Sequence, residues 1–161
     1  FSTFDWFPGE LAAAAQHVRA RTPAGSRVQH YGMDPYVLFL AERRSATPYI
    51  YAYDVNCDAA LAGSADPEGL HPTEAEAAHI RDMCRMHALD MAARLERDPP
   101  AALVLVDGSP LFSDARAEWD LAAHAPEAHR WIAQRYRVDA RFGHVSVWLP
   151  ANVTEPPTEI R

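Results

Sequence analysis

Residues 27–54 read RVQHYGMDPYVLFLAERRSATPYIYAYD, and this stretch decides the fold class. The segment before it contains Pro23 and Gly25, which end the preceding helix, so RVQHY is expected to form a short strand. Asp34 and Pro35 then have the order of a helix cap and a first helical residue, which predicts a short helix over DPYVLFLAER. TPYIYAYD, at residues 47–54, is rich in aromatic residues and predicts a second strand. A strand, a helix and a strand in succession indicate an α/β protein.

The segments on either side continue this alternation. Before it, PGELAAAAQHVRART predicts a helix. After it, Thr73 and Glu76 have the spacing of a capping box, so a long helix is expected from there to about Arg97. The remaining expected elements are an apolar strand at 101–108, helical structure over 115–136 with a break at Pro126, and two strands around Gly143.

This order predicts a single-domain three-layer α/β sandwich over residues 1–150, with a mixed, mostly parallel sheet of about five strands and a C-terminal hairpin. Residues 151–161 contain two adjacent prolines and no periodicity, so they are expected to form a tail. The chain has no apolar run near the roughly 18 residues that a membrane helix needs. Its start at Phe1 suggests a piece of a longer protein.

The charge excludes one class of partner. The formal net charge is −7, and the 15 cationic side chains are all arginine. An acidic domain with dispersed arginines repels a polyphosphate backbone, so nucleic-acid binding is not expected. The sequence has no glycine-rich nucleotide loop, and no cofactor is assigned.

Three aspartates mark the first candidate site. Asp34, Asp54 and Asp107 each follow a predicted strand, and ligands in open α/β sheets bind beyond the carboxyl ends of the strands. Together they would hold a divalent cation or act as acid and base. The alternative is that Asp34 caps a helix while the other two open turns, which is common for aspartate.

Aromatic and cationic side chains form a second candidate site. Tyr49, Tyr51 and Tyr53 alternate along the predicted strand, so they offer either a stacking surface for a sugar or a half-buried sheet face. Arg43 and Arg44 follow the short helix, where cations favour the helix dipole. They are also candidates to meet a lipid phosphate.

The two cysteines leave their own alternative open. Cys57 and Cys84 are too far apart in sequence for a zinc knuckle or a CxxC pair. They form a disulfide if the domain lies outside the cytoplasm, or they are buried free thiols, since Cys84 lies on the apolar side of the long helix.

Three segments carry a resemblance to a known family. RARTPAGSRV (19–28), DPYVLFLAERRSAT (34–47) and RDPPAALVLVD (97–107) together span most of the chain from Phe1 to Asp107. They resemble the soluble C-terminal domain of polytopic bacterial glycosyltransferases of the protein-mannosyltransferase and aminoarabinose-transferase-like superfamily.

The resemblance implies a periplasmic domain that follows membrane helices in an enzyme moving sugar from a polyprenyl-phosphate donor. The family's catalytic acids lie in the membrane portion, so no catalytic residue is assigned to this chain. The expected partner is the membrane portion of the same polypeptide, with a glycan or polyprenyl-phosphate headgroup as a candidate ligand.

Three hypotheses about function follow. The first is an accessory, non-catalytic extracytoplasmic domain of such an enzyme. The second is a free-standing α/β enzyme with a divalent metal at Asp34, Asp54 and Asp107. The third is a module that binds a sugar or a lipid headgroup through the tyrosines and the arginine pair.

Overall fold

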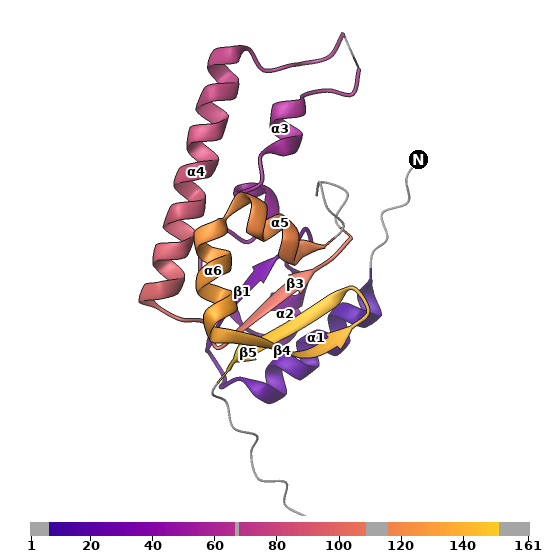
Figure 1. Cartoon of the computed structure of the whole chain (residues 1–161). Coiled ribbons are helices and arrows are strands. Elements are labelled where there is room, and N and C mark those ends of the chain that lie inside the picture. The colour runs from indigo at the N-terminus through magenta and orange to yellow at the C-terminus, as the bar shows by residue number, and fades with distance from the viewer. Residues whose placement is uncertain (1–6, 67, 109–115, 152–161) are drawn as a thin grey trace, which may run out of the picture.

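One mixed sheet forms the centre of the molecule, in the strand order β2-β1-β3-β5-β4 (Figure 1). The computed structural model describes residues 7–66, 68–108 and 116–151. β1 pairs in parallel with β2 and β3, whereas β5 pairs antiparallel with β3 and β4. The strands are β1 (Arg27–Tyr31), β2 (Arg44–Ser45), β3 (Ala102–Val106), β4 (Tyr136–Phe142) and β5 (Val145–Pro150). The α/β class, the mixed sheet and the C-terminal hairpin are therefore confirmed.

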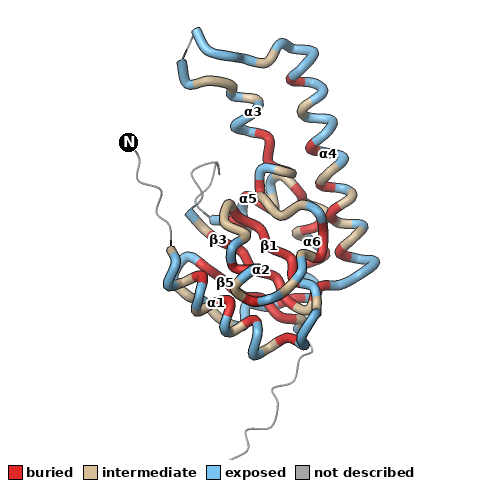
Figure 2. Tube along the Cα trace, turned by 180° about the vertical axis from the view of Figure 1, so that it is seen from behind, coloured by how far each residue is buried: buried red, intermediate tan, exposed pale blue. Residues whose placement is uncertain are grey.

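Helices cover both faces of the sheet (Figure 2). β3 is buried along its whole length, as its continuous apolar sequence predicts for a central strand. Its residues Val104 and Val106 contribute to the core under α1 and α2, while Leu103 and Leu105 contribute to the core under α4, α5 and α6. The helices are α1 (Pro8–Arg21), α2 (Tyr36–Ala41), α4 (Glu74–Arg97), α5 (Ala117–His124) and α6 (Pro126–Arg135).

Local sequence signals set several helix boundaries correctly. Thr73 Oγ1 accepts a hydrogen bond from the Glu76 amide, and Glu76 accepts one from the Thr73 amide, so the predicted capping box starts α4. Pro126 separates α5 from α6, as expected. The predicted tail lies outside the described residues from 152 onward.

The first half of α4 extends beyond the sheet, with α3 (Asp58–Ala62) beside it (Figure 1). A disulfide joins Cys57, just before α3, to Cys84 in the middle of α4. The alternative of free thiols is therefore wrong. Within the described residues, no helix is both long and apolar enough to cross a membrane.

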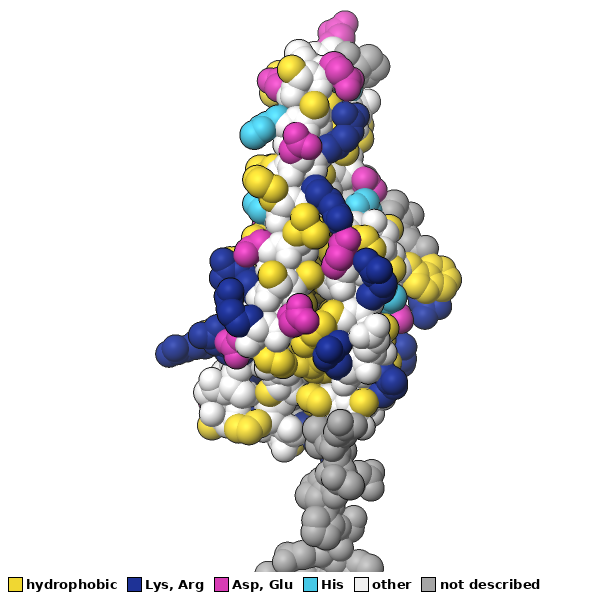
Figure 3. Space-filling model, turned by 60° about the vertical axis from the view of Figure 1, so that its left-hand side comes forward, with side chains coloured by type: hydrophobic (Ala, Val, Ile, Leu, Met, Phe, Trp, Pro, Cys, Tyr) yellow, Lys and Arg dark blue, Asp and Glu magenta, His cyan; other side chains and the backbone are white. Residues whose placement is uncertain are grey.

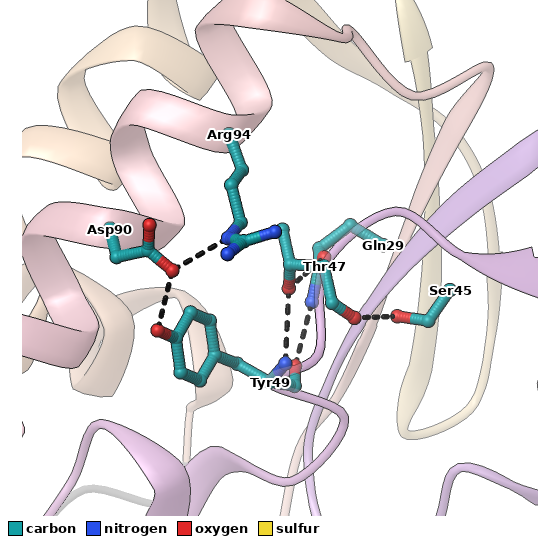
Figure 4. Close-up of polar contacts among 6 residues, drawn as sticks. All are labelled: Gln29, Ser45, Thr47, Tyr49, Asp90 and Arg94. Carbon is teal, nitrogen blue, oxygen red and sulfur yellow. Dashed lines mark hydrogen bonds and ion pairs between the residues drawn. The ribbon is translucent and has the colours of Figure 1, made fainter.

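The prediction of a strand over residues 47–54 is wrong. β2 has only two residues, and the tyrosine-rich segment continues as coil into a short 3₁₀ helix, Ala52–Asp54. Side chains take the place of a strand ladder here (Figure 4): Gln29 Nε2 donates to the Tyr49 carbonyl at 3.0 Å, and Thr47 Oγ1 accepts from the Tyr49 amide at 3.3 Å. Pro48 has no amide proton to offer a neighbouring strand.

Candidate functional site

The carboxyl ends of β1 and β3 form the edge where an α/β sheet usually holds its ligand. The chain leaves β1 toward β2 and leaves β3 toward the opposite side of the sheet, so the two connections diverge at this edge. Gly32 follows β1 here, and a Cβ atom on it would lie 2.8 Å from Val106 Cβ. The close approach of the two strand ends therefore requires glycine.

A buried polar network lies beside this edge, on the face covered by α5. Tyr31 OH donates to Asp120 Oδ2 at 2.6 Å, and Asn56 Nδ2 donates to Asp120 Oδ1 at 2.7 Å. Burial raises the pKa of Asp120, while the hydrogen bonds from Tyr31 and Asn56 and the nearby His124 favour its charged form. Burial also raises the pKa of Tyr31, with Asp120 adding to the effect. Tyr31 therefore acts as a permanent hydrogen-bond donor.

His124 connects this network to a small surface cavity. Its Nε2 lies 3.3 Å from Asp58 Oδ2 and 3.7 Å from Asp120 Oδ1. The cavity, of about 210 Å³, lies where α3, α4 and α5 meet, and the Cys57–Cys84 disulfide lines it. Because both oxygens of Asp120 accept hydrogen bonds from buried donors, the network orders three segments of chain rather than presenting a free base.

His30 is the second buried titratable group of this region. Its Nδ1 lies 2.8 Å from the Ile50 carbonyl, which makes Nδ1 the protonated nitrogen. Nε2 is buried and finds no well-aligned hydrogen-bond partner among the described residues, although the backbone of Asp34 lies near enough to favour the charged ring. Burial outweighs these contacts and lowers the pKa of His30 to about 4. The ring is therefore neutral near pH 7.

Each of the three predicted aspartates accepts a hydrogen bond from a backbone amide. Asp34 Oδ1 accepts from the Tyr36 amide at 3.0 Å, at the start of α2. Asp54 Oδ2 accepts from the Tyr51 amide at 3.0 Å, within the 3₁₀ turn.

Asp107 Oδ1 accepts from the Ala117 amide at 2.8 Å, at the start of α5. Asp54 no longer follows a strand, so the predicted alignment of three strand ends is incomplete. Across 7–66, 68–108 and 116–151, no group of three or more His, Cys, Asp or Glu side chains is placed to hold a metal ion.

The tyrosines separate into one anchor and one stacked pair. Tyr49 OH donates to Asp90 Oδ2 at 2.6 Å, and the same carboxylate accepts from Arg94 Nε at 2.6 Å (Figure 4). This contact ties the segment after β2 to α4. Tyr51 and Tyr53 stack on each other with ring centroids 5.1 Å apart, and Tyr53 is 45% exposed.

The two arginines also differ. Arg43 makes five hydrogen bonds, all to oxygens at the ends of α1 and α2. Among them, Nη2 donates to the Thr22 carbonyl at 2.8 Å and Nη1 to the Ala41 carbonyl at 3.1 Å. Its guanidinium therefore satisfies the last carbonyls of both helices. Arg44 is exposed on β2.

Sequence reasoning missed the residues of the buried network. Tyr31 was expected only as part of a strand, and Asn56 and Asp120 were given no role. A usable signal exists for Asp120, because it lies between Ala117 and Leu121 on the buried side of α5, where a carboxylate needs partners. Its partners themselves lie 89 and 64 residues away in the sequence.

Comparisons with known proteins identify no relative of this chain. No family model, no curated protein and no solved structure matches the chain.

Proposed function

We propose that this chain is an accessory, non-catalytic extracytoplasmic domain of a membrane glycosyltransferase that uses a polyprenyl-phosphate sugar donor. In this role the domain supports the membrane-embedded active site or shapes the access of the acceptor to it. The membrane portion of the same polypeptide is its partner.

The observation that carries the proposal is a contact between two of the segments that resemble the family. Thr22, in RARTPAGSRV, receives hydrogen bonds from Arg43, in DPYVLFLAERRSAT, at both its hydroxyl and its carbonyl, at 3.0 and 2.8 Å. The residues that carry the resemblance therefore build one helix-end junction of the fold. A sequence pattern that stabilises the fold in this way is expected of an appended domain that performs no reaction itself.

The disulfide supports the extracytoplasmic location. Disulfides form and persist in oxidising compartments such as the periplasm, and they are rare in the cytosol. Cys57 and Cys84 are both buried, so the bond is part of the packed structure. The three aspartates hold backbone amides, and the proposal assigns them no catalytic role.

The reading frame upstream of Phe1 tests the proposal first. Several membrane-spanning helices encoded in the same frame are the expected result, and a frame without any would overturn it. A second test incubates the purified chain with a polyprenyl-phosphate sugar and an acceptor. No transfer is expected from the chain alone, and turnover by the isolated chain would equally contradict the assignment.

The stacked pair Tyr51 and Tyr53 favours a second candidate function, a module that binds sugar. Aromatic faces provide stacking surfaces, and the exposed Tyr53 ring lies parallel to Tyr51 within 12°. Glycan-array binding that is lost in Tyr53→Ala but kept in Tyr36→Ala, a matched exposed tyrosine, would support it. Equal binding by both variants, or no binding by the parent chain, would exclude it.

A further inference from the structure

The disulfide closes the base of a projecting segment, residues 57–84, which we call the arm. The arm contains α3, the first half of α4 and the loop between them. Inside the loop, the Ser64 amide donates to the Leu70 carbonyl at 2.9 Å and the Gly69 amide donates to the Asp66 carbonyl at 2.9 Å. The described residues of the loop therefore form a turn rather than an extended connection.

The arm has almost no core of its own. Among its described residues, Cys57, Ala77 and Cys84 are the buried ones, so the disulfide accounts for much of the apolar packing. Leu70, near the tip, is 91% exposed. A segment that buries so little and is still covalently braced contributes little to the stability of the sheet, which indicates a role at its surface.

An apolar groove of about 640 Å³ lies between α3 and the start of α4. Ala60, Leu70, Pro72, Ala75 and Ile80 form its apolar lining. Gly63, Glu76 and two histidines, His71 and His79, complete its wall. The mixture of apolar floor and polar edge is typical of a site for one face of a peptide segment.

The charge of the arm is one-sided, and one of its carboxylates, Glu76, lines the groove. The arm carries six carboxylates and a single arginine, Arg81, although the whole chain has 22 acidic and 15 basic side chains. Acidic side chains gather toward the free end of the arm, while arginines lie mainly nearer the body of the domain (Figure 3). The six carboxylates, which we call the acidic rim, are Asp58, Asp66, Glu68, Glu74, Glu76 and Asp82. Two of them already face a cationic group, Asp58 at 3.3 Å from His124 and Glu74 at 3.4 Å from Arg81. A partner with positive charge next to apolar side chains is complementary to this surface.

We infer that the arm is a docking site for a cationic, apolar-faced peptide segment of a partner protein, with its apolar side chains in the groove and its Arg or Lys side chains against the acidic rim. The disulfide pre-organises the groove and so lowers the entropic cost of docking. This docking site is inferred from the geometry and charge of the arm alone, so it does not depend on the glycosyltransferase assignment.

A fluorescently labelled peptide of leucine and arginine at helical spacing is the probe, titrated into the full chain and followed by anisotropy. A serine-for-leucine peptide with the same arginines reports charge alone, and a glutamate-for-arginine peptide reports apolar contact alone. Only the first peptide is expected to bind well, and its affinity should fall as salt screens the rim. Equal binding by the serine peptide would overturn the inference.

Two variants place the peptide in the groove. Leu70→Ser removes a large apolar side chain that is 91% exposed, and Ala75→Trp fills the groove from an exposed position on α4. Leu70→Ser is expected to weaken binding about tenfold, a loss of the size expected when one large apolar contact is removed. Ala75→Trp is expected to weaken binding because its ring occupies the space that the peptide needs. Leu89→Ser, on the exposed part of α4 outside the arm, is the matched control and should leave affinity within about twofold.

A second pair of variants tests the acidic rim. Glu68→Arg is expected to weaken binding several-fold, whereas Glu96→Arg, near the far end of α4, makes the same charge change outside the arm and should not. Unchanged affinity in Leu70→Ser, Ala75→Trp and Glu68→Arg would refute the docking site. So would peptide-independent self-association through the arm, or stronger binding of the chain to anionic phospholipid vesicles than to the peptide.

Discussion

At the residue scale, the polar side chains beside the sheet edge are engaged in holding chain segments together. Asp120 joins the end of β1, the segment before α3 and helix α5 through Tyr31 and Asn56. His30 fixes the Ile50 carbonyl on the other side of β1. Such buried polar groups stabilise a fold only while every member keeps its partners.

Asp120→Ala tests this coupling. The change removes the carboxylate that accepts hydrogen bonds from the buried Tyr31 hydroxyl and the Asn56 amide, so the free energy of unfolding is expected to fall by about 3 kcal/mol. Tyr31→Phe should cost less in the Asp120→Ala background than in the parent, and urea denaturation of both single variants and the double variant measures the difference. Additive losses would show that the two side chains do not act together.

The burial of His30 predicts a pH dependence of stability. Its pKa is about 4 in the folded chain and about 6.5 in the unfolded chain, so the unfolded state binds a proton first as the pH falls. His30 therefore favours the fold fully above pH 6.5, and this contribution of about 3 kcal/mol is lost between pH 6.5 and 4.

Urea unfolding at several pH values measures how steeply the free energy of unfolding changes with pH. His30→Asn keeps a donor for the Ile50 carbonyl but does not titrate, so stability should change less between pH 6.5 and 4 in this variant than in the parent. His71→Asn, at the exposed tip of the arm, should retain the parent's slope. A parent-like slope in His30→Asn would rule out His30 as its source.

At the element scale, local signals predicted the elements whose reasons are local. The capping box of Thr73 and Glu76, the uninterrupted apolar run of β3 and the break at Pro126 each act within a few residues. The tyrosine-rich segment shows the limit. Its aromatic residues favour a strand, but Gln29, Thr47 and Asp90 bind its backbone and ring instead.

The candidate site follows the same division. The positions of Asp34 and Asp107 after β1 and β3 were predictable, because strand ends are visible in the sequence. The partners of Asp120 were not, because contacts over 64 and 89 residues depend on the complete topology. The Cys57–Cys84 pairing likewise required the position of α3 against α4.

The arm is expected to loosen alone when its disulfide is removed. Cys57→Ser with Cys84→Ser opens a loop of 27 residues, a change associated with losses of roughly 3 to 4 kcal/mol in small domains. Because the arm buries little, hydrogen exchange should rise over residues 58–83 first, while β3 amides stay protected. Exchange measured by mass spectrometry checks this, and equal loss of protection in β3 would contradict it.

At the scale of the whole molecule, the two edges of the sheet differ from its centre. β2 offers only two residues at one edge. β4 forms the other edge, with Arg137 and Arg141 exposed and an irregularity in its pairing between Val138 and Ala140. Asp139, at that irregularity, accepts a hydrogen bond from Arg21 of α1 at 3.2 Å.

Replacing this charge at the edge should change how the domain associates. Arg137→Val with Arg141→Val makes β4 a longer apolar edge, and sedimentation velocity is expected to show concentration-dependent self-association that the parent lacks. Arg97→Val with Arg130→Val, at exposed positions on α4 and α6, removes the same charge away from the sheet edge and should leave the sedimentation coefficient unchanged.

The blunted β4 edge therefore restricts how a neighbour is recruited. A partner polypeptide gains little by adding a strand to the β4 edge, which is irregular and carries two exposed arginines, or to the β2 edge, which is only two residues long. We therefore expect binding partners to be recognised by side chains on the helices and turns of the domain. The arm projects away from the sheet (Figure 1) and carries side chains exposed to such a partner, among them Leu70.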